Sequence, residues 1–115
     1  MIKFAHAQVQ GNVGKVDVRN LDGNKKVASF SVASEESYKD GEGNWQNITT
    51  WVNVVSWNPG TIKYIENNVQ VGRQVLVTGR LRNNSWEDDK GSKHTTLELH
   101  ADQIQVGAKV ADDQE

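Results

Sequence analysis

The sequence has no cysteine, a single proline and no long apolar run. Without cysteine the chain forms no disulfides, has no thiolate ligands for zinc and has no thiol nucleophile. No apolar stretch reaches the ~18 residues of a membrane-spanning helix. The N-terminus also lacks the apolar segment of a signal peptide. These absences predict a soluble intracellular protein with no membrane span.

The sequence also lacks a large excess of charge of either sign. The net charge is −2 at pH 7. This excess arises in residues 109–115, which hold one lysine and three acidic residues, so residues 1–108 are neutral overall. A basic groove for a polyanion would therefore depend on where the cations are placed. The 115 residues suffice for one domain with its own core. We expect a folded domain over residues 1–107 and a short flexible acidic tail over 108–115.

Groups that could serve catalysis or bind a metal are scattered. His6, His94 and His100 are too dispersed to suggest a metal set, and the acidic run 87–89 is more typical of a solvated turn. Neither a phosphate-binding glycine loop with Lys-Ser/Thr nor a nucleophile elbow occurs. We expect no enzyme activity, no metal and no cofactor. A nuclease is a rival hypothesis, and it would need a clustered carboxylate–arginine site with a metal ion.

What is present is a β-branched and aromatic stretch, 48–57, which ends at the turn Asn58-Pro59-Gly60. Alternation directs Val52 and Val54 to a core, and Trp51 and Trp57 to the other face, roughly 20 Å apart along a strand. Large rings beside Thr and Asn suit a platform for flat ligands. The alternative is a central strand that is buried on both faces.

The rest of the chain alternates similarly. A glycine-containing break at 11–14 predicts a bulge inside the first strand. An apolar stripe from Ile62 to Val69 predicts a short helix. In the last strand, Leu97 and Leu99 are expected to point inward. The expected strands are 3–10 continued by 15–19, 27–34, 48–57, 73–82 and 93–106, with a helix over 61–68 and polar loops over 35–47 and 83–91.

Five strands, a bulge in the first, and a helix between the third and fourth are typical of an all-β OB-fold barrel. Periodicity alone also allows other small barrels. The binding face of an OB fold is built from its second and third strands and the adjacent loops. Trp45 and Trp86 stand among polar loop residues, where an exposed indole reduces solubility unless a ligand covers it. We therefore favour a stacking role for the aromatic residues near this face: Tyr38, Trp45, Trp51, Trp57 and Trp86.

The chain resembles the bacterial-type single-stranded DNA-binding proteins. Each matching piece is weakly specific alone, but five in the family's order, over about residues 4–107, are specific together. The pieces are Gly11–Gly14 with Arg19 beyond, Val27–Tyr38, Thr50–Trp57, Gly72–Arg82 and Trp86–Gly91.

The resemblance implies sequence-independent binding and protection of single-stranded DNA during replication, recombination and repair, in the cytoplasm at the nucleoid. Trp51 and Trp86 match the family's stacking tryptophans, and Tyr38 and Trp57 match two further aromatic positions. Trp45 has no counterpart, so its role depends on the loop argument. An OB-fold module that binds RNA or oligosaccharides is the alternative.

Phosphates would be met by basic side chains on or beside the platform strands and loops. Our candidates are Lys15, Arg19, Lys39, Arg80, Arg82, Lys90 and Lys93.

The sequence departs from the family's pattern at two places that concern assembly. Val52-Asn53 stands where the family commonly has His-Arg, a position associated with subunit contacts, although the resemblance still implies a homotetramer. The family's acidic tip usually ends in Pro-Phe and recruits replication and repair enzymes, whereas this sequence reads Asp112-Asp113-Gln114-Glu115 there. Those protein partners are therefore possible but not supported by the usual tip.

Overall fold

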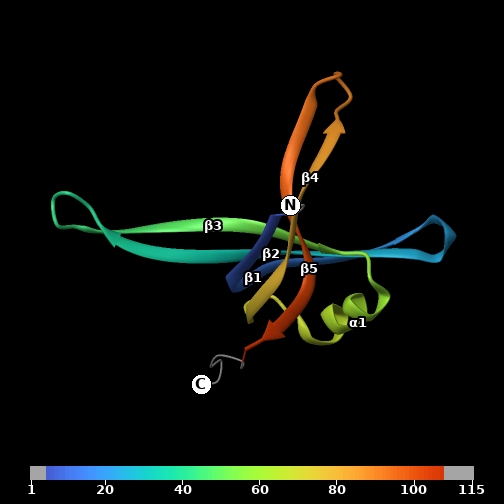
Figure 1. Ribbon diagram of the computed structural model, residues 1–115, viewed down its shortest axis with the longest axis horizontal. Coiled ribbons are helices and arrows are strands. Elements are labelled where there is room, and N and C mark those ends of the chain that lie inside the picture. The colour runs from blue at the N-terminus through green and yellow to red at the C-terminus, as the bar shows by residue number, and fades with distance from the viewer. Residues whose placement is uncertain (1–4, 108–115) are drawn as a thin grey trace.

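The computed structural model describes residues 5–107, so the expected tail over 108–115 lies outside the described residues. The strands close a barrel in the order β1-β2-β3-β5-β4 (Figure 1). This confirms the predicted all-β OB-fold barrel with one helix between the third and fourth strands. The elements are β1 (Ala5–Leu21), a 3-10 turn (Asp22–Asn24), β2 (Lys25–Lys39), β3 (Trp45–Ser56), α1 (Pro59–Asn68), β4 (Gln74–Glu87) and β5 (Lys93–Val106).

The predicted bulge lies where the glycine-containing break indicated. β1 is one continuous strand, and its pairing with β2 shifts register between Val13 and Lys15. A second shift, in the pairing of β4 with β5, falls between Thr78 and Gly79. A Cβ on Gly79 would overlap the carbonyl oxygen of His100. These bulges add the local bend that a closed barrel requires.

The core consists of aliphatic side chains and Phe30 from alternating strand positions, as the period of two predicts. It also takes Ile62 and Ile65 from α1. The largest fully buried side chains are Val32, Val54, Ile65, Val77 and Leu99.

Helix α1 begins two residues earlier than expected. The side-chain oxygen of Asn58 accepts hydrogen bonds from the backbone N–H groups of Gly60 (2.9 Å) and Thr61 (3.2 Å). Pro59 occupies the first helical turn, where its missing N–H and fixed φ are compatible with a helix. Asn58-Pro59-Gly60 is therefore a helix start as well as a turn.

The two predicted polar loops are mostly strand. β2 continues to Lys39 and β3 begins at Trp45, and β4 continues to Glu87. Trp45 and Trp86 therefore lie on strands and not in loops, although both side chains are exposed. The prediction failed because neither face of these extensions is buried, so they lack the hydrophobic alternation by which strands are recognised.

We call residues 34–50 the β2–β3 arm and residues 83–97 the β4–β5 arm. In Figure 1 the two arms leave the barrel in clearly different directions. The prediction that Leu97 points inward is wrong, because it pairs with Asn83 on the β4–β5 arm and is 56% exposed. Leu99, which lies within the barrel, is 1% exposed, as predicted. Among residues 5–107, no helix is long and apolar enough to cross a membrane.

Candidate nucleic-acid interface

A groove runs over the outer face of the barrel. It consists of two adjoining hollows of about 290 and 480 Å³. Residues of all five strands line it. We call it the barrel groove. Its charged and polar lining residues include Lys15, Asp17, Arg19, Ser29, Ser31, Asn53, Arg82, Asn84, Glu98 and His100.

All five aromatic residues predicted to stack are open to solvent. None of them belongs to the buried core. Trp51 and Trp57 come from β3 and its end, and the other three lie on the arms. Their exposed fractions are Trp45 68%, Trp51 61%, Trp57 53%, Trp86 48% and Tyr38 46%.

Trp51 is held close to the barrel surface. Its partner across the strand pair is Ala33 of β2, and its ring extends as far as Gly14 of β1. A Cβ on Gly14 would lie 2.6 Å from Cζ3 of the indole. Because Gly14 has no side chain, one edge of the indole can lie against the backbone of β1, while much of the ring stays exposed to solvent.

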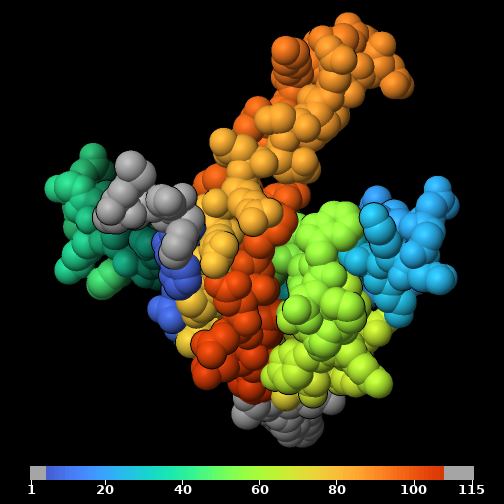
Figure 2. All heavy atoms as spheres, turned by 45° about the vertical axis from the view of Figure 1, so that its right-hand side comes forward, coloured from blue at the N-terminus to red at the C-terminus, as the bar shows by residue number. Residues whose placement is uncertain are grey.

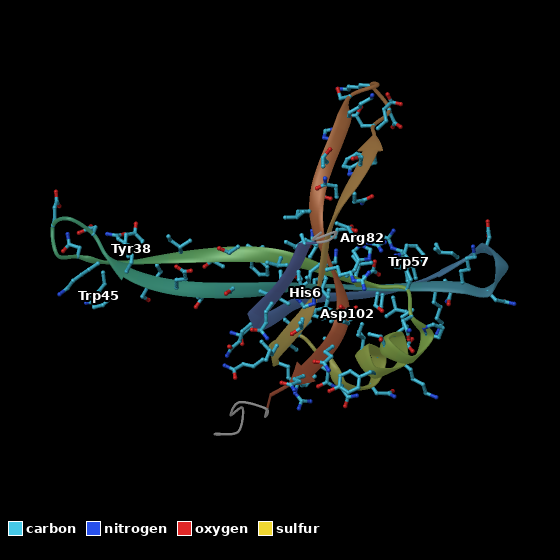
Figure 3. The ribbon with its side chains drawn as sticks, viewed as in Figure 1. His6, Tyr38, Trp45, Trp57, Arg82 and Asp102 are labelled. Atoms are coloured by element: carbon cyan, nitrogen blue, oxygen red, sulfur yellow. The ribbon has the colours of Figure 1, made fainter. Side chains whose placement is uncertain are left out.

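Trp57 lies at the end of the barrel groove. It lines the 480 Å³ hollow and also a third hollow of about 240 Å³, which contains Arg80 and Arg82. Figure 3 shows Trp57 and Arg82 near the crossing of the strands, far from Tyr38 and Trp45 at the β2–β3 arm. Arg80 and Arg82 lie two residues apart on β4, and both line this third hollow.

The turn at the end of the β2–β3 arm is organised by Asp40. Its Oδ1 accepts hydrogen bonds from the backbone N–H groups of Glu42 and Asn44, both at 2.9 Å. The side-chain amide of Gln46 donates to Oδ2 at 3.0 Å. The N–H groups of Asn44 and Glu42 are the main causes that lower the pKa of Asp40.

The β4–β5 arm ends in the same kind of turn, around Asp88. Its Oδ1 accepts from the backbone N–H groups of Lys90 and Ser92, both at 2.9 Å. Its Oδ2 lies 2.8 Å from Nε2 of His94. The bond with His94, followed by that from Ser92, lowers the pKa of Asp88.

Each turn carries an aromatic residue two positions before its aspartate. Tyr38 pairs across the strands with Gln46, and Trp86 pairs with His94. Trp86 stacks on His94 with ring centroids 4.3 Å apart and an interplanar angle of 20°. The pattern aromatic-x-Asp-x-x-Gly therefore occurs twice, at 38–43 and 86–91. This repeat was not among the predicted features, although its spacing is visible in the sequence.

The predicted cations fall into two groups. Lys15, Arg19 and Arg82 line the barrel groove, and Arg80 lies just beyond Trp57. The remaining three, Lys39, Lys90 and Lys93, lie at the arms. There the ammonium group of Lys39 lies over the ring of Trp45, 5.6 Å from its centroid.

The positive charge of the barrel groove is partly offset by two carboxylates, Asp17 and Glu98, which were not predicted to lie there. Nε of Arg19 lies 2.8 Å from Oδ2 of Asp17. Glu98 accepts from the side-chain amide of Asn84 at 3.3 Å and lies 3.3 Å from His100. The groove is thus moderately cationic and polar, which suits contacts to a sugar-phosphate backbone.

Among residues 5–107, no group of three or more potential ligands is placed to hold a metal ion. Each histidine instead lies beside a different carboxylate: His6 beside Asp102 at 3.8 Å, His94 beside Asp88 at 2.8 Å and His100 beside Glu98 at 3.3 Å.

A closed five-stranded barrel with exposed indoles beside a polar, cationic groove defines an OB-fold domain of the kind that binds nucleic acid. Residues 4–107 match the Single-strand binding protein family, and the chain belongs to that family. This membership confirms the predicted family, that of the bacterial-type single-stranded DNA-binding proteins. It does not favour the alternative of an RNA- or oligosaccharide-binding module.

Two relatives illustrate the match. The chain is 35% identical over 94 residues to Single-stranded DNA-binding protein 1 of Chlorobaculum tepidum, covering 79% of this chain but only 57% of that protein. It is 31% identical over 114 residues to Single-stranded DNA-binding protein 1 of Xylella fastidiosa, covering 97% of this chain and 83% of that protein.

Solved structures agree on the fold. The Plasmodium falciparum SSB in complex with ssDNA is 23% identical with a TM-score of 0.84, covering 94% of this chain and 98% of that chain. The mitochondrial single-stranded DNA binding protein of S. cerevisiae is 25% identical with a TM-score of 0.67, covering 94% of this chain and 99% of that chain.

Proposed function

We propose that the exposed aromatic side chains of this chain stack on the bases of single-stranded DNA without regard to sequence. The observation that carries this proposal is the exposure of all five rings, two on the barrel and three on the arms. Every base has a flat π-face, so stacking on Trp or Tyr tolerates any sequence and contributes about 1–3 kcal/mol per base.

The phosphates would be neutralised along the barrel groove and at the arms. Lys15, Arg19 and Arg82 supply the positive charge of the groove, with Arg80 beyond Trp57. Contacts of this kind release counterions, so log K should fall with log salt by about 0.7 for each phosphate neutralised on a single strand. Lys39, Lys90 and Lys93 would extend the cationic path along the arms.

In the cell, this binding would protect single-stranded DNA during replication, recombination and repair, at the nucleoid in the cytoplasm. The family resemblance supports this role and a homotetramer. One OB fold covers about 4–16 nucleotides, so several copies would extend the bound length. Mass measurements on the free protein and on its poly(dT) complex would determine the subunit number. Replication and repair proteins would be its partners in these processes.

The test is a titration with poly(dT) followed by indole fluorescence. We expect strong quenching that salt reverses. Trp51→Ala should weaken binding by more than about 1 kcal/mol while leaving the unfolding transition unchanged. The matched control is Tyr64→Ala, because Tyr64 is an exposed aromatic on α1 that lines none of the hollows containing Trp57.

Two results would contradict the proposal. One is indifference to poly(dT) alongside tight binding of RNA or an oligosaccharide. The other is a Trp51→Ala variant that unfolds more easily but binds poly(dT) as tightly per folded molecule, which would make Trp51 a structural residue.

A further inference from the structure

A further hollow on the described surface lies outside the barrel groove. It is about 740 Å³ in volume and is bounded by the start of β2 and by α1. In Figure 2 the β1–β2 hairpin, in blue, and α1, in yellow-green, lie side by side. We call it the lysine hollow. Its lining residues are Asn24, Lys25, Lys26, Trp57, Pro59, Ile62, Lys63, Glu66 and Asn67.

The lysine hollow has an excess of positive charge. Three lysines and one carboxylate line it. Lys26 lies 3.5 Å from Glu66, and this pair is partly exposed. Among residues 5–107, Lys25 and Lys63 have no carboxylate within ion-pair distance, so two cations remain for an anionic ligand. The first amides of α1 do not supply the site, because Asn58 already accepts from Gly60 and Thr61.

The hollow shares one lining residue, Trp57, with the barrel groove. The half-exposed ring of Trp57 lines the lysine hollow, the 480 Å³ part of the groove and the hollow of Arg80 and Arg82. A strand whose base stacks on Trp57 therefore has a cationic surface on either side of that ring. Pro59 and Ile62 add an apolar wall beside it.

We propose that the lysine hollow is an additional DNA subsite, which receives the segment of single-stranded DNA that leaves the barrel groove past Trp57. The phosphates lie near Lys25 and Lys63, and the base beside Trp57 rests on the apolar wall. Glu66 opposes this by repelling phosphate and by engaging Lys26. This inference rests on the proposed function and assigns a DNA-binding role to lysines that the family resemblance did not indicate.

The experiment compares the full chain with Lys25→Ala/Lys63→Ala on an oligo(dT) ladder from about 4 to about 16 nucleotides and on poly(dT). The shortest oligomers that bind should be held equally well by both proteins, because the barrel groove is intact. Longer ones should bind the variant more weakly, with a salt slope smaller by about 1.4, which corresponds to two phosphate contacts.

Glu66→Gln is the matched variant, and it should have the opposite effect on DNA binding. It removes the repelling carboxylate and frees Lys26, so it should tighten binding of the longer oligomers and leave the short ones unchanged.

The outcomes separate the two proposals. If the wild-type chain ignores poly(dT), both the proposed function and the lysine hollow fail. If it binds but the double variant matches it at every length and salt concentration, only the lysine hollow is overturned. An equal loss at all lengths would also overturn it, because the lysines would then act as general surface charge.

Discussion

The indole of Trp51 overlies Gly14, which belongs to a strand that is not its hydrogen-bonded neighbour. Its Cζ3 atom would be only 2.6 Å from a Cβ at that position. The ring thus crosses over β2 and ends on bare backbone of β1. Ser31 Oγ lies 3.0 Å from the same point, so the glycine is enclosed on two sides.

Gly14→Ala should therefore displace the indole while leaving the barrel intact, because the clash is with the far end of an exposed side chain. We expect weaker poly(dT) binding, with a loss below the ~1–3 kcal/mol that removing a stacking ring produces. Fluorescence titration and thermal unfolding would measure the two effects. Gly41→Ala is the control, since a Cβ there meets nothing within 4 Å. Binding equal to wild type would show that Trp51 does not need this placement.

His94→Ala tests whether the imidazole positions Trp86. The stacked imidazole, held by Asp88, limits the orientations of the indole. Its removal should weaken poly(dT) binding, and the effect should largely disappear in a Trp86→Ala background. A double-mutant cycle measures this coupling. Strictly additive losses would mean that His94 acts on DNA separately from Trp86.

The two arm turns should lose stability in acid. The folded-state pKa of Asp40 and of Asp88 is lowered from 3.8, so each carboxylate stabilises its turn above that pH. This stabilisation is lost as pH falls below about 3.8 through the lowered pKa. NMR signals of Gly43 and Gly91 should report the transition. Asp40→Asn retains an acceptor oxygen without the titration, so Gly43 should become insensitive to pH in this range while Gly91 still responds.

How much of this was accessible from sequence depends on whether burial leaves a periodic signal. The barrel strands, the bulge and the exposed indoles were predicted, because alternation and glycine placement encode them locally. The arms were not predicted, because neither of their faces is buried. Apolar residues there, such as Ile48 and Leu97, are exposed and therefore do not mark a buried face. The lysine hollow was missed as well, because it joins Lys25 and Lys63 from distant elements.

Leu97 and Leu99 provide a direct check of that distinction. Leu99→Ala should cost about 2–5 kcal/mol of stability, as is usual for a fully buried leucine. Leu97→Ala should stay within roughly 0.5 kcal/mol, since the residue is exposed on the β4–β5 arm. Urea denaturation of both variants would measure this. Similar losses for the two would indicate that Leu97 is covered in solution, for example by another subunit.

Gly79→Ala should be far more damaging than Gly14→Ala. A Cβ at Gly79 meets the backbone of His100 and Ala101, which cannot rotate away as a side chain can. Overpacking of this type costs at least about 1–3 kcal/mol. We expect a lower midpoint in chemical denaturation, with Gly41→Ala again as the reference. An unchanged midpoint would show that β4 and β5 can separate at the bulge without cost.

Barrel closure also determines where a foreign chain could join by main-chain pairing. Within the described residues, several strand segments pair with a neighbour on one side only, and the β2–β3 arm is one of them. There, Trp45–Val52 pairs only with β2. This edge is rich in β-branched and aromatic residues, which is the usual profile of a segment that templates aggregation. A bound DNA strand or a neighbouring subunit that covers the arm would therefore also shield this edge from pairing with other chains.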